Sequence, residues 1–132
     1  MKISKYTSYF HDGEILEIKH IGDNVEILMR SAEIDPDDMK DNIPLSKDDV
    51  LRGKLHIEGI KNIKMNDNPF LGLIVKIHEE NDLLHFKIIK NTVFLEIGWR
   101  GCKPFQSDFS AFEIEAEKIW WENIPDLEDP KS

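Results

Sequence analysis

Apolar and polar residues alternate with a period of two along most of this 132-residue chain. That period places every second side chain on the same face, as in a half-buried β-strand. Short clusters of Gly, Asn, Asp and Pro, which favour turns, separate the alternating segments. The segments that follow the pattern are 16–21, 25–30, 54–65, 71–77, 84–88, 93–99 and 112–116. The sequence therefore predicts about seven strands.

Short connections between strands favour antiparallel pairing of sequence neighbours. The expected fold class is mainly β, with about seven antiparallel strands in a meander that forms a sandwich, an open sheet or a partly closed barrel. Asp35-Pro36 has the chemistry of an N-cap and a first-turn proline, which predicts one or two short helical turns in the 35–52 connection. Residues 1–124 are expected to form a single domain and the acidic residues 125–132 a loosely ordered tail.

Three local features refine this picture. Gly59-Ile60 interrupts the alternation and predicts a β-bulge. Residues 101–110 are expected to form a loop, and residues 117–122 fit either a strand or a helix. Adjacent tryptophans on a strand point to opposite faces, so one of Trp120 and Trp121 is expected in the core and the other nearer solvent.

Asn81-Asp82 predicts a two-residue turn between segments 71–77 and 84–88. Pairing about this turn places Ile77 opposite Phe86, so that apolar side chains meet. The same register leaves Ile74 and Ile89 on the other, mixed face. That face is expected to be covered by another element or to serve as a binding surface.

Two histidines become neighbours in this register. His78 lies opposite His85, and opposed Cβ atoms are about 4.5–5.5 Å apart, close enough for two imidazoles to share a metal ion. His78 and His85 are therefore the candidate metal ligands, and His11 in His11-Asp12-Gly13 is a further candidate. The competing interpretations are two exposed histidines on a sheet face and a simple turn at Asp12-Gly13.

Charge is the most distinctive property of the composition. The chain has 17 Lys and Arg against 26 Asp and Glu, a formal net charge of −9. Such a protein repels phosphates, so nucleic acid is not an expected partner. The acidic residues between the second and third predicted strands are Asp35, Asp37, Asp38, Asp41, Asp48 and Asp49. They lack the spacing of a calcium-binding EF-hand loop, and they form either a solvated face or a docking surface for a basic protein.

The remaining candidates are an aromatic residue and a thiol. A tryptophan exposed beside Glu122 would anchor a protein interface, and Trp121 and Glu122 are the candidate partner-binding residues. Cys102 is the only cysteine, which excludes an intrachain disulfide and fits a reducing cytosol. No family signature of a catalytic cysteine surrounds it. The N-terminus lacks a signal-peptide pattern and no run reaches the ~18 apolar residues of a membrane helix, so a cytoplasmic protein without a membrane partner is expected.

The segment Tyr9-Phe10-His11-Asp12-Gly13, which leads into an alternating strand, a turn and a second strand, resembles small bacterial β-rich proteins of unassigned function. Some of these are grouped with immunity proteins of polymorphic toxin systems. The closing Trp120-Trp121-Glu122 is similar in a looser way. The resemblance implies a single-domain binder that neutralises a toxin by covering its active site, and an acidic inhibitor suits a basic toxin such as a nuclease.

The sequence thus favours a non-enzymatic protein-binding module, without a cofactor, that presents an acidic surface to a basic partner. Two alternatives remain open at this point. One is a β scaffold that binds a small ligand or metal through His78 and His85. The other is a structural module in which the mixed face around Ile74 and Ile89 is buried in a homo-oligomer.

Overall fold

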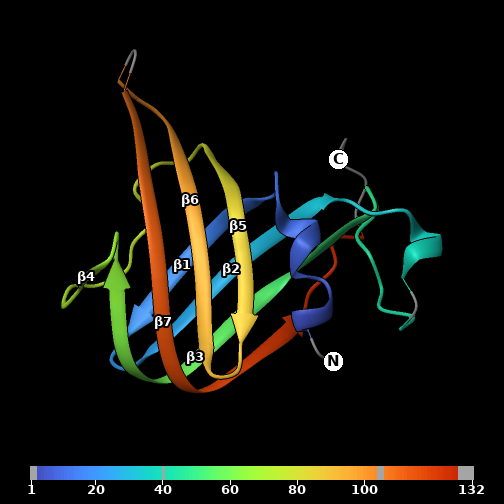
Figure 1. Cartoon of the computed structure of the whole chain (residues 1–132). Coiled ribbons are helices and arrows are strands. Elements are labelled where there is room, and N and C mark those ends of the chain that lie inside the picture. The colour runs from blue at the N-terminus through green and yellow to red at the C-terminus, as the bar shows by residue number, and fades with distance from the viewer. Residues whose placement is uncertain (1–2, 40, 104–105, 128–132) are drawn as a thin grey trace.

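The computed structural model describes residues 3–39, 41–103 and 106–127, with side chains for all of these except 101–103 and 106–108 (Figure 1). Its strands form one antiparallel sheet of seven, which confirms the mainly β fold class. The strands are β1 (Glu14–Ile21), β2 (Asn24–Glu33), β3 (Val50–Met65), β4 (Asn68–Pro69), β5 (Asn81–Ile89), β6 (Thr92–Lys103) and β7 (Gln106–Asn123). Three short 3₁₀ helices accompany them: η1 (Ile3–Lys5), η2 (Thr7–Phe10) and η3 (Pro36–Asp38).

The strand order is β1-β2-β3-β7-β6-β5, and β4 pairs with the end of β3. Each half of the sheet is a meander of sequence neighbours, and the long strands β3 and β7 join the halves. Their pairing runs from Gly53 opposite Asn123 to Met65 opposite Phe112. Figure 1 shows β5, β6 and β7 in front of β1 and β2, so the curved sheet has two halves that face each other.

The core lies between these halves and is supplied by alternate residues of every long strand. Residues Val25, Ile27 and Met29 of β2 are fully buried, as the alternation predicts. Helix η2 closes one end of the core because Phe10 packs edge-on against Phe86 and Trp121, with ring centroids 5.2 and 5.6 Å apart. The two N-terminal 3₁₀ helices had no signal in the period-two pattern.

The edge strands β1 and β5 approach each other where β5 begins. Asn81 is buried, its Oδ1 accepts the Ile15 N–H at 2.8 Å, and its Nδ2 donates to the Ile15 carbonyl at 2.9 Å. Next to it, the Asp12 N–H donates to the Leu83 carbonyl and the Leu83 N–H to the Gly13 carbonyl, both at 2.9 Å. A side chain and a short backbone link therefore hold the two edges together.

Segment 71–77 overturns one prediction, because it alternates like a strand and yet is not one. Ile74 is buried, whereas its neighbours Leu73 and Val75 are exposed. No turn forms at Asn81-Asp82, where β5 begins, and β5 pairs with β6 instead. The edge of β1 beside this segment is occupied by side chains: Asn81 bonds to Ile15, and the Lys76 ammonium donates to the Leu16 carbonyl at 3.0 Å. A regular backbone ladder with β1 is thereby prevented.

Four further predictions concern local structure. Helix η3 begins after Asp35, whose carboxylate accepts the Asp37 N–H at 3.0 Å, as the predicted N-cap requires. The register of β3 against β7 shifts between Ile60 and Asn62, next to Gly59 at φ +66°, so the predicted bulge is confirmed. Residues 117–122 belong to β7. The prediction of a loop over 101–110 is wrong, because β6 continues to Lys103 and β7 begins at Gln106.

Candidate functional site

The expected histidine pair does not form. His78 lies in the connection before β5, where its Nδ1 accepts the Glu80 N–H at 3.2 Å. His85 lies on β5 with its Cα opposite Glu96 of β6. The prediction that His78 opposes His85 is wrong because the strand that was to carry His78 does not exist. Within the described residues, no three His, Cys, Asp or Glu side chains are grouped as metal ligands.

His85 instead comes near His11. Both histidines line an open cavity of about 370 Å³, together with Thr7, Ser8 and Lys87. The Nδ1 of His11 lies 2.8 Å from the Leu84 carbonyl and is placed to donate to it. The backbone turns here, with Asp12 at φ 68°. His11 thus has the backbone-bonded role that the turn interpretation predicts. The side chain of Cys102 lies outside the described part of the chain.

The 35–49 connection, which contains η3 and carries the acidic residues, lies at one end of the molecule (Figure 1). We call them the acidic loop: Asp35, Asp37, Asp38, Asp41, Asp48 and Asp49. All six are exposed except Asp49, which is half-buried. Within the described residues, only Asp48 of the six forms an ion pair, with Arg30 at 3.8 Å. Most of this negative charge therefore faces solvent.

The C-terminal segment lies against the base of this loop. The Asp126 N–H donates to the Ser46 hydroxyl at 2.8 Å, and the Lys47 N–H donates to the Asp126 carbonyl at 2.7 Å. The Asn123 side chain donates to the Pro44 carbonyl at 2.9 Å, and the Arg52 guanidinium donates to the Ile124 carbonyl at 2.8 Å. Asp126 of the C-terminal segment is thus held beside the acidic loop.

One hydrogen bond ties the acidic loop to the N-terminal helices. The Tyr6 hydroxyl donates to the Asp41 carboxylate, and the Tyr6 side chain is buried. The hydrogen bond to Asp41 raises the pKa of Tyr6 above its ordinary value, and burial and the negative charge of Asp41 act in the same direction. The phenol therefore stays neutral, and the bond persists over the whole physiological pH range.

A polar cavity of about 370 Å³ adjoins the loop and shares Asp48 with it. Its ionisable side chains are Asp12, Glu14, Glu33, Asp48, Asp82, Arg30 and Arg100. Arg30 pairs with Glu14 at 2.6 Å, and Arg100 pairs with Asp82 at 3.1 Å. Five carboxylates against two guanidinium groups leave this cavity with an excess of negative charge. It extends the acidic surface of the loop.

One of the two tryptophans is buried and the other partly exposed, as the alternation predicts, but the exposed one is Trp120 and not Trp121. Trp121 is 7% exposed and packs in the core, whereas Trp120 is 38% exposed. The prediction that Trp121 anchors a partner is therefore wrong, because the register of β7 turns that residue inward. Trp120 stacks on His56 with ring centroids 4.0 Å apart.

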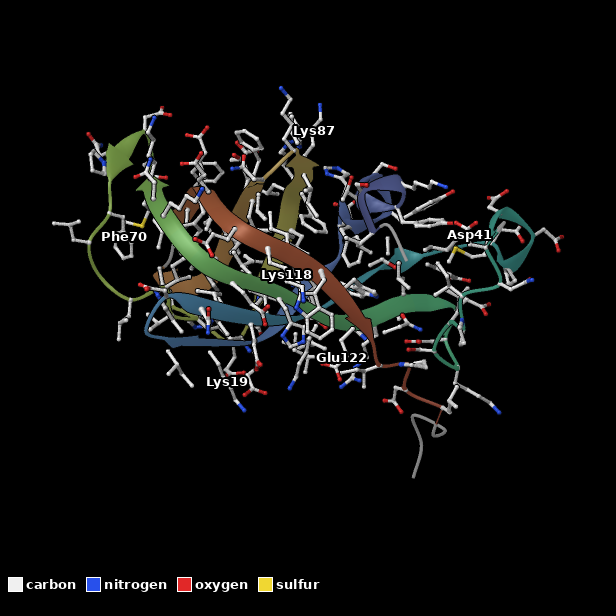
Figure 2. The ribbon with its side chains drawn as sticks, turned by 90° about the horizontal axis from the view of Figure 1, so that it is seen from below. Lys19, Asp41, Phe70, Lys87, Lys118 and Glu122 are labelled. Carbon is white, nitrogen blue, oxygen red and sulfur yellow. The ribbon has the colours of Figure 1, made fainter. Side chains whose placement is uncertain are left out.

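Sequence reasoning missed the cluster beneath Trp120. His56 is buried on the outer face, with Nε2 2.8 Å from the Glu122 carboxylate and Nδ1 3.5 Å from Glu26. Figure 2 shows Glu122 and Lys118 on the same side of β7. Glu26, His56 and Trp120 lie opposite one another on β2, β3 and β7. Only the long-range β3–β7 register could have revealed this row. Glu122 contacts His56 in it, so its carboxylate already has a partner within the protein.

No family model, curated protein or solved structure matches this chain. Among the described residues, none of the helices has the length and apolar character of a membrane span, since the longest covers four residues.

Proposed function

We propose that this protein is a non-enzymatic binding module that docks its acidic end onto a basic protein. The observation that carries the proposal is the exposed charge of the acidic loop, of which only Asp48 is ion-paired within the described residues. Exposed charges of one sign steer an oppositely charged partner and accelerate encounter. The sequence resemblance to immunity proteins is compatible with this role, in which the basic partner is a toxin such as a nuclease.

Two structural features support the proposal. The C-terminal segment is held beside the loop by backbone hydrogen bonds at Asp126, which gives the acidic end a defined shape. The adjoining cavity of about 370 Å³ has more carboxylates than guanidinium groups and is large enough to admit a lysine or arginine side chain of the partner. Binding of a basic partner to such a surface requires no catalytic residues.

The test begins with affinity capture at low salt and identification of the basic protein that elutes as salt rises. Association of the purified pair is then followed by stopped-flow fluorescence, for wild type and for the quadruple Asp→Asn variant at positions 37, 38, 48 and 49. Asparagine tolerates the positive φ of 63° at Asp49. We expect association to slow by about tenfold or more at low ionic strength and to lose most of its salt dependence.

A matched control removes four charges elsewhere, as Glu→Gln at positions 96, 113, 115 and 117 of β6 and β7. It has the same net charge as the test variant, so it separates a local docking surface from a general effect of charge. Equal rates for the two variants would contradict the proposal.

A further inference from the structure

The segment 71–77 presents a stripe of apolar side chains that no part of the described chain covers. Every second residue points outward, while Ile74 between them is 2% exposed. The outward residues and their exposed fractions are Leu71 at 101%, Leu73 at 61%, Val75 at 57% and Ile77 at 51%. Four neighbouring exposed apolar residues form a patch of the kind that marks interaction surfaces.

The backbone of the same segment belongs to no helix or strand. Among the described residues, no backbone–backbone hydrogen bond involves residues 71–79. Two of its backbone groups bond to side chains instead: the Ile74 N–H donates to His20 Nδ1 at 2.8 Å, and the Glu79 carbonyl accepts from Asn81 at 3.4 Å. An extended chain with alternating apolar residues and unpaired backbone groups is a template for another strand.

Charge favours self-association at this place over the rest of the surface. Lys76 is the only Lys, Arg, Asp or Glu between residues 68 and 78. Its ammonium group is mostly buried and bonds to the Glu79 carboxylate at 2.9 Å and to the Leu16 carbonyl at 3.0 Å. Figure 2 shows Phe70, just before the stripe, at the opposite end of the molecule from Asp41 in the acidic loop. Two copies that meet here keep their acidic ends apart.

We propose that a second copy of this chain pairs with segment 71–77 as an antiparallel strand, with the twofold axis at Ile74. This centre places Leu73 opposite Val75 of the second copy and Leu71 opposite its Ile77. All four outward residues then meet apolar partners, and no like charges oppose each other. Centring on Val75 would instead place Leu71 opposite Glu79. The inference does not depend on the proposed function of the acidic end.

Such an interface is small. One strand pair contributes less than the roughly 800 Å² per partner of a standard interface, so we expect a weak dimer that forms only at high protein concentration. Because each chain has a net charge of −9, salt screens the mutual repulsion and strengthens association. The dimer would display two acidic ends that point away from each other.

Sedimentation equilibrium of the full chain, at concentrations up to about 1 mM, tests the proposal. We expect wild type to approach twice the monomer mass, and Leu73→Glu to remain monomeric because it places a carboxylate opposite Val75 of the second copy. The matched control is Ile89→Glu, which adds the same charge at a residue that is 46% exposed on β5. This control is expected to dimerise like wild type.

The double variant Leu73→Glu/Val75→Lys tests the register itself. In the proposed pairing each new glutamate faces a new lysine, so dimerisation is expected to return. Leu73 and Val75 are exposed, so the variants are expected to fold, and far-ultraviolet circular dichroism checks this. A wild type that stays monomeric at 1 mM in high salt would overturn the proposal. So would a dimer that Ile89→Glu disrupts and Leu73→Glu does not.

Discussion

Asn81 offers the sharpest test of how the two edges of the sheet are held together. Its side chain makes both hydrogen bonds to Ile15, at 2.8 and 2.9 Å, as a neighbouring strand would. Replacement of Asn81 by alanine leaves the Ile15 N–H and carbonyl without partners in a buried site. Each buried polar group that loses its partner costs about 1–3 kcal/mol, so we expect a loss of about 3 kcal/mol in the free energy of unfolding.

The expected change in melting temperature follows from the chain length. Unfolding entropy of about 2.1 cal/mol/K per residue gives about 0.28 kcal/mol/K for 132 residues. A loss of 3 kcal/mol therefore lowers Tm by about 10 °C. Differential scanning calorimetry and urea denaturation would measure the two quantities independently. The matched control is Asn91→Ala, at an exposed turn position whose side chain makes two long contacts, at 3.5 Å to Glu115 and at 3.4 Å to Thr92. Equal losses for the two variants would refute the reasoning.

Asn81→Asp refines the test through its pH dependence. At neutral pH the carboxylate still accepts the Ile15 N–H but opposes the Ile15 carbonyl, whereas its protonated form can donate to that carbonyl. Burial raises the pKa of such a carboxyl group in the folded state, so the folded state binds more protons. The deficit relative to wild type is therefore expected to shrink as the pH falls through the raised pKa of the folded state, and to level off below the ordinary Asp pKa of about 3.9.

Two further predictions concern packing and the acidic loop. Gly53→Ala places a Cβ 2.2 Å from the Glu122 carbonyl oxygen and against the Trp121 ring. Chemical denaturation is therefore expected to show a loss of about 3 kcal/mol or more in the free energy of unfolding. The control Gly98→Ala, whose Cβ meets only ordinary contacts from 3.4 Å, is expected to stay within about 1 kcal/mol of wild type. Tyr6→Phe removes the hydrogen bond to Asp41 and is expected to lower Tm. Because the pKa of Tyr6 is raised in the folded state, wild type keeps its higher stability below pH 10.0 and loses it as the phenol ionises above that pH. A deficit that persists unchanged well above pH 10.0 would contradict the assigned role of the hydroxyl.

Local pattern proved a good guide to strands whose neighbours lie close in sequence. The alternation of Val25, Ile27 and Met29 predicted both a strand and its buried face, because burial on one face is a property of every second residue. The N-cap at Asp35 was readable for the same reason, since its hydrogen bond reaches only to Asp37. The candidate acidic surface was likewise visible as a run of charges.

The pairing of the strands could not be predicted from the sequence, because it depends on residues far apart in the chain. Segment 71–77 has the alternation of a strand, but side chains of Asn81 and Lys76 occupy the neighbouring edge of β1. The pairing of β3 with β7 decides that Trp121 is buried and that Trp120 covers His56. By itself the sequence determined which residues favour an extended chain and where negative charge collects. The tertiary structure decided which edges pair and which side chains meet, because hydrogen bonds between strands are made with whichever neighbour the whole fold brings alongside.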